Sequence, residues 1–207
     1  MRWFQRRRPE PRATEAATAA AETHRSLALA ELLGELHPDR RLHILDLGPA
    51  VGANISFWSD RHRCSVQVAD FYRSLPLPPG ADPEEAVRDA LPGAHGSVDL
   101  VLAWDLLNYL DRDLLGTLAG RLGKLCHRGS VLFAMMSTVP EIPREPGSYL
   151  IHPDGTLTYR VDRTRPRPGP RYRPADLAKL MPGFATDRNF LLRHGVQEYL
   201  LVRTEDL

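Results

Sequence analysis

The chain has 207 residues, of which 43% are hydrophobic and 26% are charged, and its net charge is +1. This length and composition are typical of one globular domain with a sizeable core. The balanced charge provides no overall field that would attract nucleic acid. Cys64 and Cys126 form no C-x-x-C pair, so they predict neither a metal site nor a disulfide framework and suit a reducing cytoplasm. No apolar run is long enough to span a bilayer.

Residues 1–13 are expected to form a flexible basic arm ahead of a single domain at 14–207. Five arginines fall within the first 12 residues, against one acid, Glu10. This arm predicts either a weak anchor to anionic lipid or nucleic acid, or a solvated terminus, and we favour the terminus. No apolar stretch follows the arginines as in a signal peptide, so we expect a cytoplasmic protein.

Residues 14–36 are rich in Ala, Glu and Leu, and leucines recur at helical spacing from Leu29 to Leu36. They predict one amphipathic helix, ended by Pro38, that packs against a sheet.

Residues 42–54 combine a short apolar run with a turn that contains two glycines. The run predicts a buried parallel strand, with Asp46 near its carboxyl end. Gly48 and Gly52 lack a Cβ, so the backbone can turn sharply and a ligand can approach the main chain closely. Residues 55–61 predict a helix. A strand, a glycine-containing turn and a helix N-terminus provide a place for a small polar ligand.

Residues 64–70 predict a second short strand that ends in an acid, Asp70. Such an acid in a nucleoside-binding α/β fold accepts hydrogen bonds from both ribose hydroxyls, because both carboxylate oxygens are acceptors in one plane. Phe71 follows, placed to lie against an adenine face. The alternative is that Asp70 only begins a turn.

Residues 73–97 predict no third strand. Prolines and Gly80 indicate a loop, and Pro83 followed by two acids predicts a helix over 82–90. Asp89, an acid of this segment, falls on that helix.

Residues 98–110 predict a buried strand from which Trp104 and Asp105 emerge at the carboxyl end, where a doubly wound sheet faces its ligand crevice. Trp104 would line this crevice, and Asp105 would orient a substrate. The alternative places Trp104 in the core and leaves Asp105 as a helix-start residue.

Residues 111–129 predict a helix with Asp111 as N-cap, His127 near its C-terminus and Gly129 as its stop. Residues 131–136 are a continuous apolar run that predicts a strand buried on both faces.

Residues 139–173 are expected to be an insertion. Two strand-like segments flank Pro153-Asp154-Gly155, which predicts a hairpin. Six arginines follow between 160 and 173. This insertion would lie over the crevice as a lid or substrate selector and favour an anionic substrate or partner. The alternative is a solvated arm.

Residues 174–203 predict a short helix over 174–181 and two strands over 184–192 and 196–203. His194, between the two strands, is expected to be structural.

The segment 46–54 resembles the first motif of the class I S-adenosylmethionine-dependent methyltransferases, an acid followed by G-x-G-x-G, with Ala50 in place of the middle glycine. The segment 98–110 is similar to the fourth motif of this family, and residues 174–203 resemble the end of its sheet.

This resemblance covers about residues 26–205. It implies an α/β, Rossmann-like doubly wound sheet, mostly parallel with an antiparallel last strand, helices on both faces and a small β-hairpin insertion. It also implies S-adenosyl-L-methionine as the cofactor and no metal. The cofactor-binding residues it implies are Asp46, Gly48, Pro49, Gly52, Asn54, Asp70, Phe71 and Trp104. Asp105 is the candidate for a catalytic role.

The leading hypothesis is therefore methyl transfer to a small molecule or another soluble acceptor. A second hypothesis is a non-catalytic methyltransferase fold that serves as a binding or regulatory module. Ala50 supports it, as does the lack of the acid that the family carries in its third-strand region, for which Asp89 is the only nearby candidate. A third hypothesis is a nucleic-acid-associated protein that uses the Arg-rich segments, against which the lack of aromatics interleaved on strands argues.

Overall fold

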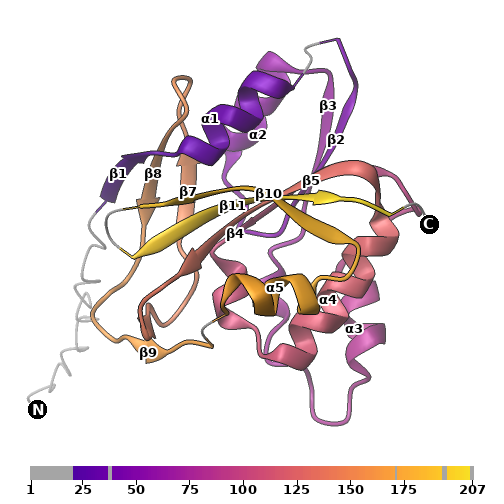
Figure 1. Ribbon diagram of the computed structural model, residues 1–207, viewed down its shortest axis with the longest axis vertical. Coiled ribbons are helices and arrows are strands. Elements are labelled where there is room, and N and C mark those ends of the chain that lie inside the picture. Colours follow the sequence, from indigo (N-terminus) through magenta and orange to yellow (C-terminus); the bar gives the residue numbers. More distant parts are fainter. Residues whose placement is uncertain (1–20, 37–38, 171, 193–194, 206–207) are drawn as a thin grey trace, which may run out of the picture.

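The computed structural model describes residues 21–36, 39–170, 172–192 and 195–205. The basic arm and His194 lie outside these residues. A six-stranded sheet in the order β10-β11-β5-β4-β2-β3 runs through the middle of the molecule (Figure 1). Its strands are β2 (Leu42–Asp46), β3 (Cys64–Val68), β4 (Val98–Trp104), β5 (Cys126–Ser137), β10 (Phe184–Leu191) and β11 (Val196–Arg203).

The four strands β2, β3, β4 and β5 are parallel, whereas β11 runs antiparallel to β5 and β10 antiparallel to β11. Central parallel strands are covered on both faces, which explains why β4 and β5 are apolar over most of their length. The predicted mostly parallel sheet with an antiparallel end is confirmed.

Helices cover both faces of the sheet (Figure 1). They are α1 (Leu27–Glu35), α2 (Gly52–Arg61), α3 (Pro83–Ala90), α4 (Arg112–Leu125) and α5 (Pro174–Leu180), with 3₁₀ turns η1 (Phe71–Ser74) and η2 (Leu106–Tyr109). Alternate side chains of a strand point to opposite faces. Leu45 and Val101 therefore join the core beneath α3, α4 and α5, while Ile44 and Leu100 join the core beneath α1 and α2.

The prediction of one helix over 14–36 is wrong for its middle part. Residues Ala21–Arg25 form strand β1, which pairs antiparallel with β8 (Thr156–Arg160). Helix α1 begins after Ser26, whose Oγ accepts a hydrogen bond from the Leu29 N–H at 3.0 Å. Pairing with a distant strand overrides the local helix propensity of this segment.

The helix predicted to stop at Gly129 ends earlier, at Leu125. Cys126 pairs with Val98 of β4, so the chain enters β5 directly. The Ser130 hydroxyl donates to the Val98 carbonyl at 2.7 Å and accepts from the His127 N–H at 2.9 Å, which holds this turn of chain on the sheet. Gly129 has a φ of +86° within β5 and is not a helix cap. Asp111 does cap α4, because its carboxylate accepts from the Leu114 N–H.

No strand forms within residues 73–97, as predicted, and β3 is the edge of the central sheet. Helix α3 occupies residues 83–90, with Asp82 as its N-cap. No helix in the part of the chain that the structure describes is long and apolar enough to cross a membrane.

The predicted hairpin is confirmed as β7 (Ser148–Ile151) and β8, with Gly155 at a φ of +80° in the turn. Together with β1 it forms a three-stranded sheet in the order β1-β8-β7, which lies beside α1 in Figure 1. The segments β6 (Glu141–Ile142) and β9 (Arg167–Pro168) pair at the two ends of the insertion.

Candidate functional site

The turn after β2 is organised by the carboxylate of Asp46. This residue is 4% exposed, and its Oδ1 accepts from the Gly48 N–H at 2.9 Å. Burial raises the pKa of Asp46 and the charge of Asp70 raises it further, while the hydrogen bonds from Gly48 and Trp104 lower it. The influence of Asp70 on Asp46 reflects the meeting of two parallel strand ends at one edge of the sheet. Pro49 follows in the turn, and Gly52 begins α2.

Trp104 at the end of β4 lies against this turn. Its backbone has a φ of +49°, a left-handed conformation that side-chain-bearing residues rarely adopt. The indole Nε1 donates to Asp46 Oδ1 at 2.7 Å. A Cβ added to Gly48 would lie 2.7 Å from Trp104 Cδ1. The space that glycine leaves open at this position is therefore filled by the indole, which is 3% exposed.

The β7–β8 hairpin covers the other face of the indole. The Tyr149 ring stacks on Trp104 at 5.1 Å with an interplanar angle of 3°, and Tyr159 stacks on Tyr149 at 5.9 Å. Asn54 of α2 ties the hairpin to the turn, because its amide donates to the Tyr149 carbonyl at 2.8 Å and accepts from the Ile151 N–H at 2.9 Å. The hairpin therefore lies against Trp104 at the carboxyl end of β4.

Of the two residues expected to contact adenosine, Asp70 is part-exposed and Phe71 is buried. Asp70 has a φ of +42°, and its part-exposed carboxylate pairs with Arg73 at 3.4 Å. Phe71 is 1% exposed and belongs to the core on the α4 side, so its ring does not line a surface crevice. Asp89 is exposed on α3 and lies near Arg88.

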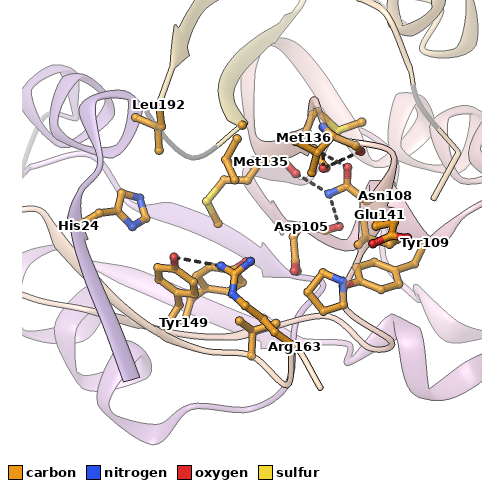
Figure 2. A pocket seen from close by; sticks show the side chains of 18 of the residues that line it. His24, Asp105, Asn108, Tyr109, Met135, Met136, Glu141, Tyr149, Arg163 and Leu192 are labelled. Atoms are coloured by element: carbon orange, nitrogen blue, oxygen red, sulfur yellow. Dashed lines mark hydrogen bonds between the residues drawn. The ribbon is translucent and has the colours of Figure 1, made fainter. Parts of the chain in front are cut away.

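A cavity of about 300 Å³ opens beside the stacked rings of Tyr149 and Tyr159 (Figure 2). Its walls come from β1, the β4–η2 segment, β5, the hairpin and the turn between β10 and β11. The lining side chains include His24, Asp105, Asn108, Tyr109, Met135, Met136, Tyr149, Tyr159 and Arg163. Among the predicted residues, Asp105 alone lines this cavity.

Asp105 directs its carboxyl group into the cavity (Figure 2). Its Oδ2 accepts from the Gly147 N–H at 3.0 Å, and its Oδ1 is buried with no hydrogen-bond partner. Burial raises the pKa of Asp105 to about 6, against smaller lowering effects from Gly147 and the Tyr149 hydroxyl. Burial together with the Asp105 charge raises the pKa values of Tyr109 and Tyr149, so both remain neutral.

Asn108 shapes the same wall without a free polar atom. Its amide nitrogen donates to the carbonyls of Asp105 and Met135, each at 2.8 Å, and its oxygen accepts from the Ser137 N–H at 2.7 Å. The side chain thereby fixes η2 against β5 and holds Asp105 at the carboxyl end of β4.

Sequence reasoning missed the aromatic walls of the cavity. Tyr149 and Tyr159 pair across the β7–β8 hairpin, so their residues lie on one face of it. The alternation of the predicted hairpin could have indicated that shared face. Nothing local indicated that His24 would reach the cavity, because it depends on β1.

In this arrangement the indole of Trp104 occupies the open side of Gly48, which S-adenosylmethionine would need. In the family that the sequence resembles, the methionine part approaches the first glycine, here Gly48, whose open side is occupied by Trp104. The Asn54 side chain is engaged by hairpin backbone on both of its polar atoms. Asp70 keeps a part-exposed carboxylate that a ribose could reach after displacing Arg73.

No protein-family model matches the chain, and no curated protein matches it. Among solved structures it is similar to an S-adenosylmethionine dependent methyltransferase from Mesorhizobium loti, with 15% identity and a TM-score of 0.51 over 85% of this chain and 96% of that one. It is also similar to a chain of the complex between the Haloferax volcanii Trm112 methyltransferase activator and the putative methyltransferase. There the identity is 10% and the TM-score 0.51, over 86% of this chain and 88% of that one. The chain has the class I S-adenosylmethionine-dependent methyltransferase fold.

Proposed function

We propose that this protein is an S-adenosylmethionine-dependent methyltransferase that acts on a small, soluble acceptor. The observation that carries the proposal is the gathering of Asp46, Gly48 and Asp70 at the carboxyl ends of β2 and β3, next to the cavity that Asp105 lines. In this fold, the carboxyl ends of the strands form the ligand crevice. The cavity then serves as the acceptor site.

Cofactor binding requires one rearrangement within the chain. The indole of Trp104 must leave the open side of Gly48, which breaks its hydrogen bond to Asp46 and its stack on Tyr149. Asp46 keeps the turn in shape through Gly48, and Asp70 is the residue for the ribose. Pro49 and Gly52 stay as predicted cofactor contacts, and Asn54 would join them only by giving up its hydrogen bonds to the hairpin backbone.

Asp105 is the titratable group of the acceptor site. With a pKa of about 6, its carboxyl group is largely ionised at neutral pH and can accept a proton from a donor atom held in the cavity. Its neighbours Tyr109 and Tyr149 stay neutral and line the cavity beside it.

Calorimetric titration with S-adenosylmethionine and S-adenosylhomocysteine tests this proposal. We expect Asp70→Ala to weaken binding by about 1–3 kcal/mol, because two ribose hydroxyls lose their acceptor. Asp89→Ala is the matched control, since it removes an exposed acid of the following helix, and it should leave the affinity unchanged. Equal affinities of the wild-type protein and Asp70→Ala would contradict the assignment of Asp70.

A second candidate function is a non-catalytic binding module, and the position of Trp104 favours it. If the turn is not a cofactor site, neither the wild-type protein nor Trp104→Ala will bind the cofactor in the same titration. Binding by Trp104→Ala alone would show a cofactor site closed by this side chain. The nucleic-acid hypothesis receives no comparable support, because Arg163 pairs with Glu22 and Arg173 pairs with Asp176.

A further inference from the structure

The cavity beside β4 contains one buried polar atom that lacks a partner. In the described part of the chain, four buried side-chain nitrogen or oxygen atoms have no hydrogen-bond partner, and of these only Asp105 Oδ1 belongs to a residue that lines this cavity. A buried carboxylate oxygen without a donor is costly, since it has lost its water and gained nothing in exchange. A ligand that brings a donor would remove this cost.

The remaining walls are flat and apolar. The rings of Tyr109, Tyr149 and Tyr159 line the cavity, together with the side chain of Met135. Tyrosine faces carry partial negative charge and attract cations and the edges of aromatic rings, while methionine packs against irregular apolar shapes. A cavity of about 300 Å³ is at the small end of the usual range for ligand pockets.

The charges around the cavity favour a ligand with a donor over an anion. Glu198 is fully buried and pairs with His24 at 3.2 Å, and Glu141 lies at the rim. Arg163 lies beside Tyr159, and Glu22 and the Tyr159 hydroxyl already engage its guanidinium, while Arg167 lies over the ring of Tyr109 at 5.7 Å. Arg25 also lines the cavity but is exposed to solvent, so an anionic ligand would meet the buried carboxylate of Asp105 with only a water-screened cation beside it.

We propose that this cavity binds a small planar aromatic compound that carries an amino group, which donates a hydrogen bond to Asp105 Oδ1 while the ring lies among the tyrosines. This compound would be the methyl acceptor, a role that rests on the proposed methyltransferase function. The binding itself needs no cofactor. This amino compound takes the place of the anionic acceptor that the arginines of the insertion predicted.

Three probes that share one ring test this preference. Tryptamine carries an amino group, 3-methylindole carries no charge, and indole-3-acetate carries a carboxylate. In protein-observed NMR titrations without S-adenosylmethionine, we expect tryptamine to bind most tightly and indole-3-acetate at least about tenfold more weakly. The shifted resonances should include those of Tyr149 and Met135.

Asp105→Asn keeps the shape of the side chain and removes its charge. It should lower the affinity for tryptamine roughly tenfold or more and abolish the preference over 3-methylindole. Glu141→Gln is the matched control, because it neutralises an acid at the exposed rim, where water screens the charge, and it should change the affinity less than about twofold. The dispersion of the NMR spectrum shows whether each variant is folded.

The order in which the wild-type protein binds the three probes can by itself overturn the proposal. Indole-3-acetate binding as tightly as tryptamine, or no probe binding at millimolar concentration, would do so, as would an unchanged affinity of folded Asp105→Asn for tryptamine. These titrations contain no cofactor, so failure of cofactor binding in the calorimetric experiment leaves their result intact. A positive probe ranking without cofactor binding would identify a binding module.

Discussion

Two neighbouring regions at one edge of the sheet differ in how they are filled. The turn after β2 has its open side occupied by Trp104, which hydrogen-bonds to Asp46 and is stacked under Tyr149. The cavity beside it contains no such side chain, and Asp105 Oδ1 remains without a partner in it. The first region satisfies its polar groups internally, whereas the second leaves one for a ligand.

Tyr149 connects the two regions. One face of its ring stacks on Trp104, and the residue also lines the cavity next to Asp105. A movement of the hairpin that released Trp104 would therefore also reshape the acceptor site. The filled turn and the cavity with Asp105 thus share one neighbour, the β7–β8 hairpin.

The largest expected effect comes from removing the side chain that fills the turn. Trp104→Ala should lower the free energy of unfolding by about 3–5 kcal/mol, as for other buried tryptophans, and should raise the affinity for S-adenosylmethionine at least about tenfold, equivalent to 1.4 kcal/mol. Urea unfolding and calorimetric titration measure the two effects.

Trp58→Ala provides the matched control for Trp104. Trp58 is fully buried in the same core cluster, and no contact joins it to Gly48. It should lose similar stability with no gain in cofactor affinity. A gain in both variants would mean that loosening of the core, and not an opened turn, admits the cofactor.

The next effect concerns the unpartnered carboxylate. The pKa of Asp105 is raised from 3.8 to about 6 in the folded protein. Between these values the folded state binds more protons than the unfolded state, so stability falls as the pH rises from about 4 to 6 and stays lower above. Two pKa units correspond to about 3 kcal/mol at most. Asp105→Asn should remove this part of the pH dependence in urea unfolding at pH 4, 5, 6 and 7.

A ligand with a donor should reduce the same pH effect in the wild-type protein. Bound tryptamine stabilises the ionised carboxylate, so it should raise the melting temperature more at pH 7 than at pH 4. Identical shifts at both values would show that the ligand does not contact Asp105.

The strands and most helices follow from local sequence, because the apolar run of β4, the cap at Asp111 and the turn at Gly155 are local. The site was predictable only in part. Asp46, Gly48 and Trp104 meet because parallel strands end at one edge of a sheet, and the motif pattern contains that information. The filling of the turn was not predictable, because it depends on the left-handed backbone of Trp104 and on a hairpin about 45 residues further along the chain.

The misassigned N-terminal segment has the same explanation. Ala21–Arg25 has the composition of a helix, yet it pairs with β8 and brings His24 into the cavity wall. Strand pairing over a long sequence separation is decided by the partner and not by the segment.

The smallest expected effect separates the two glycines of the turn. Gly48→Ala places a methyl group 2.7 Å from Trp104 Cδ1 and 3.3 Å from Asp46 Oδ1, and should destabilise the fold by about 1–3 kcal/mol. Gly52→Ala meets no atom within 4 Å at the start of α2 and should be neutral or stabilising by up to about 1 kcal/mol.

In a Trp104→Ala background the cost of Gly48→Ala should fall, since the main obstacle is gone, and the difference measured by urea unfolding gives the coupling between the two residues. An unchanged cost in that background would place the obstacle in the backbone of the turn and not in the indole.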